Sequence, residues 1–251
     1  MREYSWKNKK WEILSLIFFL AIWRILSIKV NNDIYIPKIE EVIKSISTII
    51  KEKNFGLNFS NSLIRTIISF LTAYILAVIL GVLSLIYPVF QILFKPVNSI
   101  GKTIPTMVLV LLALIWFDKD KTPFIVGFAI VFPILYEGAI SAVSNADKEL
   151  LEMCSIYNVS KIQKIKKLYI PIIKFYTAGI FASTFSLAFK VVIAGEVHGQ
   201  PKYGIGSAIQ LEKMNFNITG IFAWIVIIAI MSIFLDMLNK LILRKINRWK
   251  Q

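Results

Sequence analysis

Charged side chains inside long apolar segments are the residues of this sequence that could do chemistry. Glu137 and Lys190 each interrupt an apolar run. A charged group is costly in a bilayer, so a residue of this kind is first read as part of a solute or ion pathway. Glu137 follows Pro133 by one helical turn, where a kink frees a backbone carbonyl. Lys190 could draw an anion inward, and interhelical hydrogen bonding or snorkelling is the competing interpretation for both residues.

Glu137 and Lys190 look like an ion pair, but their expected depths argue against one. On the spans given below, Glu137 lies about 14 residues from the outer end of its helix and Lys190 about five, which at 1.5 Å per residue separates them by roughly 13 Å. We therefore expect the two side chains to act separately.

Other site chemistry is poorly supported. Cys154 is the only cysteine and His198 the only histidine, so we expect no disulfide within the chain, no cysteine-based zinc site and no histidine cluster. Residues 101–103 read Gly-Lys-Thr, like the end of a phosphate-binding loop, but position 96 is Pro where that loop has Gly. We expect no metal, no cofactor and no nucleotide site.

The composition indicates a membrane protein. Of the 251 residues, 57% are hydrophobic and only 18% charged, which exceeds what a soluble core uses. The net charge of +14 would point to nucleic acid in a soluble protein. In a membrane protein it instead marks cytoplasmic loops, so we expect a lipid environment and no nucleic acid partner.

Six apolar runs are expected to span the membrane. They lie at residues 12–28, 65–87, 104–117, 123–143, 172–195 and 219–241. The third is short and contains Pro105, which predicts a strongly distorted helix or one that begins earlier, near Val97. An amphipathic helix is expected at 39–52. The predicted fold class is all-α: a polytopic membrane protein with about six transmembrane helices in a single domain over 1–251.

The distribution of Lys and Arg predicts the orientation. About 17 of the 29 basic residues, Arg2, Arg248 and Lys250 among them, fall in segments that are cytoplasmic if the N-terminus is inside. We therefore expect both termini in the cytoplasm of a bacterial cell, and a multi-pass protein of its cytoplasmic membrane.

The loop between the fourth and fifth spans has a helix-turn-helix pattern. Asn145 or Asp147 can cap a first helix, and Asn158 tolerates the left-handed conformation that ends it. Ser160 and Gln163 form a capping box that opens a second helix. The pattern predicts a short helix presented toward the cytoplasm.

This loop resembles that of the permease subunits of binding-protein-dependent ABC importers. Their pattern is Glu-Ala-Ala, three residues, Gly, nine residues, then Ile-x-Leu-Pro, and its spacing is met by Glu152, Asn158, Leu168, Ile170 and Pro171. Met153 and Cys154 replace the alanines, and Asn158 replaces the glycine. The resemblance covers about 60–245, with the coupling loop at 145–171, and is nearest the branch that imports nitrate, sulfonates, taurine and pyrimidine-type precursors.

The resemblance implies a permease that works with partners. Its short coupling helix would dock on the ABC ATPase, present in two copies, through the loop residues Glu149, Glu152, Met153, Cys154, Tyr157, Asn158 and Pro171. A second permease copy would complete the pore, and an extracytoplasmic solute-binding protein would deliver the solute. Glu196 would lie near the surface that faces this protein or the gate, as a third candidate pathway residue. ATP hydrolysis is expected in the partner, so the chain itself is not an enzyme.

Other interpretations stay open. The loop could instead rest on anionic lipid headgroups through its lysines. The chain could be a self-contained secondary carrier or channel that uses Glu137 and Lys190 for ion coupling. The small residues between 178 and 186 could serve a subunit interface, a pore wall or packing within one bundle. The solute could be an anion such as a sulfonate or nitrate, or a pyrimidine-type precursor.

Overall fold

The computed structural model describes residues 6–247, and every regular element within them is helical. The predicted all-α fold class is confirmed. Arg2, Arg248 and Lys250, which contributed to the predicted orientation, lie outside the described residues.

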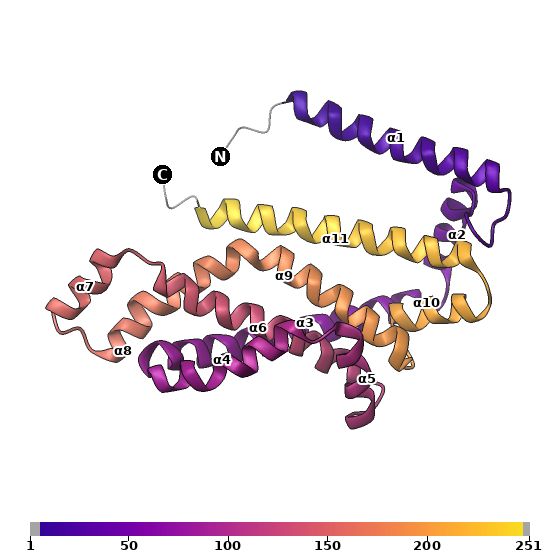
Figure 1. Cartoon of the computed structure of the whole chain (residues 1–251). Coiled ribbons are helices and arrows are strands. Elements are labelled where there is room, and N and C mark those ends of the chain that lie inside the picture. The colour runs from indigo at the N-terminus through magenta and orange to yellow at the C-terminus, as the bar shows by residue number, and fades with distance from the viewer. Residues whose placement is uncertain (1–5, 248–251) are drawn as a thin grey trace. The chain divides into compact units, whose positions relative to one another are not determined.

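Figure 1 shows the elements in chain order. They are α1 (Trp6–Val30), α2 (Ile39–Lys51), α3 (Phe55–Ile86), α4 (Pro88–Thr103), α5 (Thr106–Trp116), α6 (Thr122–Ser144), α7 (Lys148–Ile156), α8 (Lys161–Lys164), the π-helical turn η1 (Ile165–Tyr169), α9 (Ile170–Gly199), α10 (Ile205–Met214) and α11 (Ile218–Asn247).

The chain groups into two compact units. The first comprises Met1–Gly56 with Ile209–Ala229, and the second comprises Leu57–Ala208 with Ile230–Gln251. Each unit is described by itself. A single permease domain over 1–251 stays a prediction.

Five helical runs in the described residues are long and apolar enough to cross a membrane. They lie in α1, in α3, in α6, in the continuous run from α8 through η1 to α9, and in α11. The pair α4 and α5 makes a sixth if it counts as one broken span. The prediction of about six transmembrane helices is confirmed.

The third predicted span is the one that differs most from a regular helix. α4 and α5 are bent by 106° at the break between them. Pro105 causes the break because it has no N–H to continue the helix and disfavours helical geometry at Ile104, whose ψ is 125°. The predicted distortion is therefore present, and the helix before the break begins at Pro88 instead of near Val97.

The second predicted span starts too late. α3 begins at Phe55, ten residues before the predicted start at 65. Its first turns carry the polar side chains of Asn58, Ser62 and Arg65, which hydropathy excludes from a span. These side chains form contacts inside the protein, so the helix extends beyond the apolar run.

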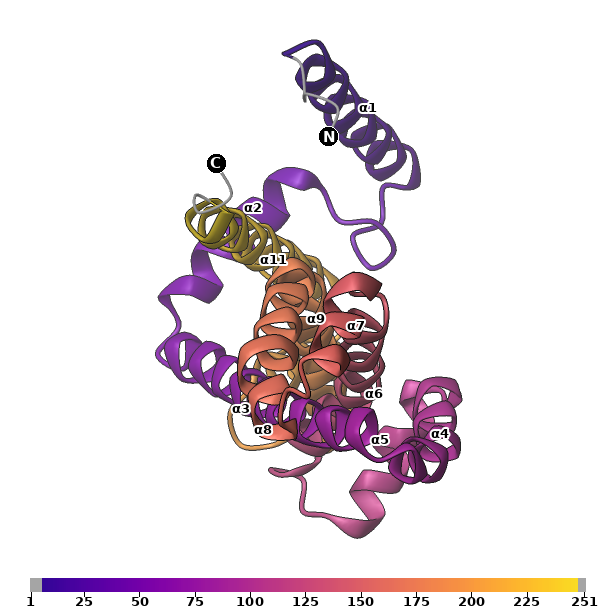
Figure 2. The same ribbon diagram turned by 90° about the vertical axis from the view of Figure 1, so that its left-hand side faces the viewer.

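The core of the second unit lies between α6 and α9, which run beside each other (Figures 1 and 2). Small residues allow this close approach. A Cβ on Gly195 would come within 2.9 Å of the Pro123 backbone, and one on Gly127 within 2.8 Å of the Val192 side chain. An aromatic cluster around the fully buried Ala188 fills the centre of the unit. The tight packing makes α6 and α9 the frame that positions the loops at their ends.

The first unit contains the predicted amphipathic helix, which is α2. Val42 and Ile49 on its apolar face are each 2% exposed, so this face is buried. Trp23 of α1 donates a hydrogen bond from its indole N–H to the carbonyl of Pro37, at 3.1 Å. Arg24 forms an ion pair with Glu40 at the start of α2, which accounts for a charged residue in the first span.

Candidate functional site

The loop at 145–171, the predicted coupling loop, has the helix-turn-helix structure that its residues predict. Asp147 accepts a hydrogen bond from the backbone N–H of Glu149 at 3.1 Å, beside the start of α7. Asn158 adopts the left-handed conformation with φ 47°. Ser160 Oγ accepts a hydrogen bond from the Gln163 N–H at 3.3 Å and so caps α8. Local hydrogen bonds therefore fix both ends of the turn.

The side chains of α7 form an exposed surface that is partly apolar. Leu150 is 42% exposed, Met153 47% and Ile156 75%. Tyr157, just after the helix, is also 75% exposed. A group of large apolar side chains at this level of exposure is typical of a surface that contacts another protein or the membrane. We call Leu150, Met153, Ile156 and Tyr157 the α7 patch.

Three of the other predicted loop residues, Glu149, Glu152 and Cys154, lie on the same helix as the α7 patch. Glu149 and Glu152 are exposed on α7, and Cys154 is half-buried. Pro171 lies apart from them, in the first turn of α9. Its missing N–H cannot complete a hydrogen bond to the carbonyl of Lys167, and the chain widens there into the π-helical turn η1.

A cation–π contact joins this loop to another turn of the second unit. The Lys161 ammonium lies 4.9 Å from the centre of the Tyr87 ring. Lys161 begins α8, and Tyr87 lies between α3 and α4. The contact therefore connects the coupling loop with the corner where α4 begins.

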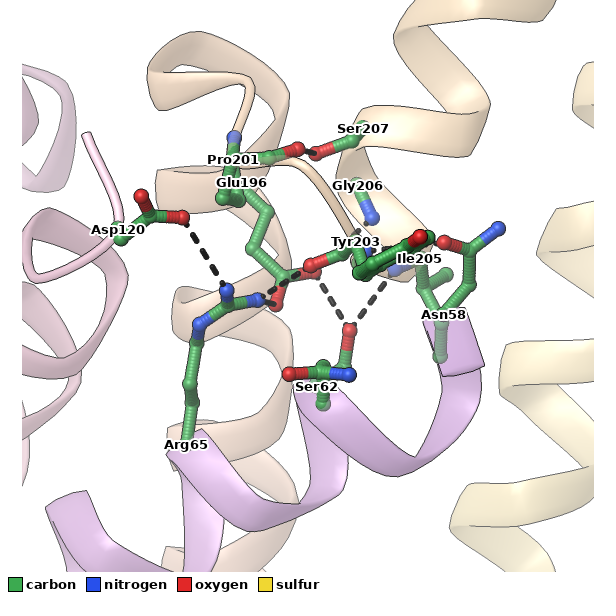
Figure 3. A network of polar contacts seen from close by, with 12 residues as sticks. Asn58, Ser62, Arg65, Asp120, Glu196, Pro201, Tyr203, Ile205, Gly206 and Ser207 are labelled. Carbon is green, nitrogen blue, oxygen red and sulfur yellow. Dashed lines mark hydrogen bonds and ion pairs between the residues drawn. The ribbon is translucent and has the colours of Figure 1, made fainter. Parts of the chain in front are cut away.

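A second polar site lies where α9 meets the start of α10, and it centres on Glu196 (Figure 3). The Glu196 side chain is fully buried and accepts three hydrogen bonds. Ser62 Oγ donates to Oε2 at 2.6 Å, and the Gly206 N–H donates to the same oxygen at 3.0 Å. Arg65 Nη1 donates to Oε1 at 2.7 Å, in an ion pair that supplies the charge a buried carboxylate needs.

The start of α10 is held by three side chains in succession. The backbone N–H groups of Gly204, Ile205 and Gly206 donate in turn to Asn58 Oδ1, Ser62 Oγ and Glu196 Oε2. Helix starts leave such N–H groups without partners and carry a partial positive charge, so a carboxylate is a favourable acceptor there. We call this arrangement, together with Arg65, the α10 latch.

The position of Gly206 shows how tightly the α10 latch is packed. A Cβ on this residue would lie 2.3 Å from the carbonyl oxygen of Ile193 and 2.7 Å from the backbone nitrogen of Val197. Both atoms belong to the backbone of α9, which cannot move aside as a side chain can. Glycine is therefore required for α10 to start this close to α9.

The sequence alone does not single out the α3 side chains of the α10 latch, which are Asn58, Ser62 and Arg65. Arg65 is the first residue of the predicted span at 65–87, whereas in the structure it lies ten residues inside α3. Besides Glu196, its Nη1 donates to the Tyr203 carbonyl at 2.7 Å, and its Nη2 lies 3.7 Å from Asp120. Arg65 thus connects α3, α9, the turn before α10 and the turn before α6. A predicted span that began at α3's true start would have flagged it as an intramembrane charge.

The described residues contain no ion pair between Glu137 and Lys190, which agrees with the depth argument. Glu137 forms an ion pair with Lys102 of α4 instead. Lys190 is exposed on α9. No cluster of His, Cys, Asp and Glu side chains in the described part of the chain has the arrangement of a metal site.

Comparison with known proteins adds independent information. Residues 73–248 match the family described as the inner membrane component of binding-protein-dependent transport systems. An ABC transporter permease protein of Methanocaldococcus jannaschii is 26% identical over 223 residues, covering 86% of this chain and 83% of the relative. An aliphatic sulfonates transport permease protein of Bacillus subtilis is 21% identical, covering 99% and 90%. A riboflavin transport system permease protein of Chloroflexus aurantiacus is 26% identical, covering 62% and 58%.

The family match extends over more than half of the chain and includes α6, α7 and α9. It agrees with the several apolar helices of a multi-pass membrane protein. It also agrees with the resemblance that the coupling loop predicted. The chain therefore belongs to the inner membrane components of binding-protein-dependent transport systems and is an ABC transporter permease.

Proposed function

We propose that this chain is the pore-forming subunit of an ATP-driven importer and that the α7 patch docks on a separate ATPase. The observation that carries the proposal is the exposure of Leu150, Met153 and Ile156 on a short helix. Asp147 accepts a hydrogen bond beside the start of this helix, and the left-handed Asn158 follows its end. Burying these apolar side chains against a partner is favourable, and a preformed helix loses little entropy on docking.

The contacts around the loop give a route for the movement of a docked helix. Lys161 packs on Tyr87 at the start of α4, and η1 continues directly into α9. A displacement of α7 and α8 would therefore act on two helices of the second unit. In this proposal, ATP binding and hydrolysis in the partner change the access of the pore through these connections.

The importer would contain two such chains, two ATPase subunits and an extracytoplasmic solute-binding protein. Gly179 and Ser183 of α9 support the second copy. Both are exposed, they lie one helical turn apart, and a Cβ at Gly179 would meet no atom within 4 Å. Small residues on an open helix face allow another helix to approach closely.

Orientation follows from the lysine distribution and places the coupling loop in the cytoplasm with both termini. Single cysteines at Lys161 and Lys202, in a Cys154→Ser background, test it. We expect an impermeant thiol reagent added to intact cells to label the cysteine at 202 and to leave the one at 161 unmodified. Labelling of both positions from outside would contradict the topology.

Docking is tested by two substitutions in the loop. Glu152→Lys reverses a charge beside the α7 patch, and Asn158→Val penalises the left-handed conformation by about 1–2 kcal/mol. Both permeases should insert in the membrane but retain the ATPase poorly on purification. Asn31→Val is the matched control, because Asn31 also has a positive φ, of 45°, and lies before α2. Equal ATPase retention in all three variants would reject the docking proposal.

The solute is a small molecule, and an organic anion is the class we favour. The relative from Bacillus subtilis carries the name of an aliphatic sulfonate permease, whereas the relative from Chloroflexus aurantiacus is named for riboflavin. Nitrate and pyrimidine-type precursors are further candidates. Binding assays on the solute-binding protein that works with this permease would decide among them.

A self-contained secondary carrier is the alternative function. It predicts uptake by the purified chain in vesicles, driven by an ion gradient without any ATPase. The pairing of Glu137 with Lys102 leaves Glu137 already neutralised by a fixed cation. That is a less favourable arrangement for a carboxylate that must bind and release a coupling ion.

A further inference from the structure

A groove between α4 and α6 has the features of a binding site. Its volume is about 420 Å³. The polar residues that line it include Gln91, Lys95, Asn98 and Lys102 from α4, and Glu137 and Ser141 from α6. This volume is within the range of small-molecule sites. The groove lies within the second unit and is separate from the α7 patch and the α10 latch.

The polar residues from α4 form one continuous stripe. Gln91, Lys95, Asn98 and Lys102 follow one another at intervals of four, three and four residues, which places them on the same face of the helix. That face is directed toward α6, since all four residues line the groove. Four polar side chains in a row are costly at a helix contact of a membrane protein unless something polar occupies the space between them.

Asn98 provides a second and independent sign of a ligand. The residue is only 8% exposed, and its Oδ1 has no hydrogen-bond partner among the residues that the structure describes. A buried carbonyl oxygen without a donor costs about 1–3 kcal/mol, so such atoms normally meet a partner. The missing partner is a donor, which could be an N–H or O–H group of a bound molecule.

The charges in the groove define the other part of the ligand. Lys102 is paired with Glu137, so these two charges compensate each other. Lys95 forms no ion pair within the described part of the chain. The groove therefore carries one uncompensated positive charge, which favours a monoanion over a neutral molecule. Glu137 would repel the second charge of a dianion.

We propose that this groove binds the transported solute and that the solute is a small organic monoanion carrying a hydrogen-bond donor. Lys95 attracts the anionic group, such as a sulfonate or carboxylate, and Asn98 Oδ1 accepts from the donor. The proposal rests on the function proposed above, because it assigns the groove to the path of the imported solute.

The test uses a cysteine inside the groove and three probes of matched shape. Ser99 also lines the groove, and Ser99→Cys in a Cys154→Ser background gives a single thiol there. Its rate of modification by an anionic methanethiosulfonate reagent is measured in vesicles of phosphatidylcholine. The probes are 2-hydroxyethanesulfonate, with charge and donor; ethanesulfonate, with charge alone; and 2-(methylsulfonyl)ethanol, with the donor alone.

We expect 2-hydroxyethanesulfonate to slow the modification most, ethanesulfonate to slow it less, and the neutral sulfone to have no effect. Lys95→Met should reduce the rate on the order of tenfold, whereas Lys44→Met, at an exposed lysine of α2, should leave it unchanged. Glu137→Gln releases Lys102 and should raise the rate. Because Glu137→Gln changes the rate in the opposite direction to Lys95→Met, it still tests the role of charge if the Lys95→Met permease fails to insert.

Three results would overturn the proposal. Equal protection by the neutral sulfone would remove the role of charge. Protection that follows the phosphatidylglycerol content of the vesicles, and not the added sulfonate, would identify a lipid headgroup as the occupant. A thiol that no reagent reaches in the inserted permease would mean that a second copy or lipid fills the groove. Labelling needs no ATPase, so a failure of the docking proposal would be seen separately, in ATPase retention.

Discussion

Glu196→Gln should destabilise the permease strongly although it replaces only one oxygen by nitrogen. The change removes the charge that balances Arg65, and the new amide cannot accept from Ser62, Arg65 and Gly206 together. Breaking a buried ion pair by changing one partner costs about 3–5 kcal/mol. In the variant, Arg65 still donates a hydrogen bond to the Tyr203 carbonyl, which lies at 2.7 Å. We therefore expect a loss of stability at the lower end of that range, about 3 kcal/mol.

Thermal unfolding in detergent measures this loss. At about 2–4 °C per kcal/mol for a chain of this size, the melting temperature should fall by roughly 6–12 °C. Glu149→Gln is the control: Glu149 is exposed on α7, and its substitution should change stability by less than about 0.5 kcal/mol.

A double-mutant cycle separates the ion pair from general damage to the fold. Arg65→Gln alone should also destabilise, because it leaves the Glu196 carboxylate buried without its cation. The double variant should then be more stable than the sum of the two single losses predicts. Strict additivity, or a Glu196→Gln variant as stable as the Glu149→Gln control, would refute the α10 latch as an energetic unit.

Three further predictions follow from particular positions. Gly206→Ala should prevent α10 from starting against α9 and lower the melting temperature by more than 5 °C or so, whereas Gly179→Ala, in open space, should leave it unchanged. Partial desolvation of the Glu52 carboxyl, which stays exposed, together with the like charge of Glu212, raises the pKa of Glu52 above its ordinary value of 4.5. The charged form therefore opposes folding, and this penalty disappears as the pH falls through the raised pKa. Glu52→Gln should stabilise the protein at neutral pH and flatten its stability profile just above pH 4.5. Ser160→Ala should remove the cap of α8, at a cost of about 1 kcal/mol, and increase amide hydrogen exchange in that turn.

The coupling loop could be predicted closely because its structure depends on neighbours in the sequence. Ser160 caps a helix through the N–H three residues later, and Asn158 ends a helix through its own backbone conformation. The break at Pro105 was predictable for the same reason. Short-range rules apply to each of these positions, and no knowledge of the packing is needed.

The partners of the buried charges could not be predicted in this way. Arg65 and Glu196 are 131 residues apart, and no local pattern relates them. The depth argument predicted that Glu137 does not pair with Lys190, but it could not indicate Lys102 as the partner. Lys102 reaches Glu137 because α4 packs against α6, and this tertiary contact leaves no pattern in the local sequence.

The coupling loop and the α10 latch lie at opposite ends of α9, so this helix connects them mechanically. α9 begins next to η1 and reaches Glu196 near its last turn. Its 30 residues extend over about 45 Å at 1.5 Å per residue. A long helix packed along α6 moves as a rigid body. A movement of the coupling loop can therefore change the backbone at only two positions, one at each end of α9. One is the π-helical turn η1, where the hydrogen-bond pattern is already irregular. The other is the start of α10, where the α10 latch resists it. On the proposed function, the strength of the latch would therefore decide how much of the movement reaches the far end of the permease.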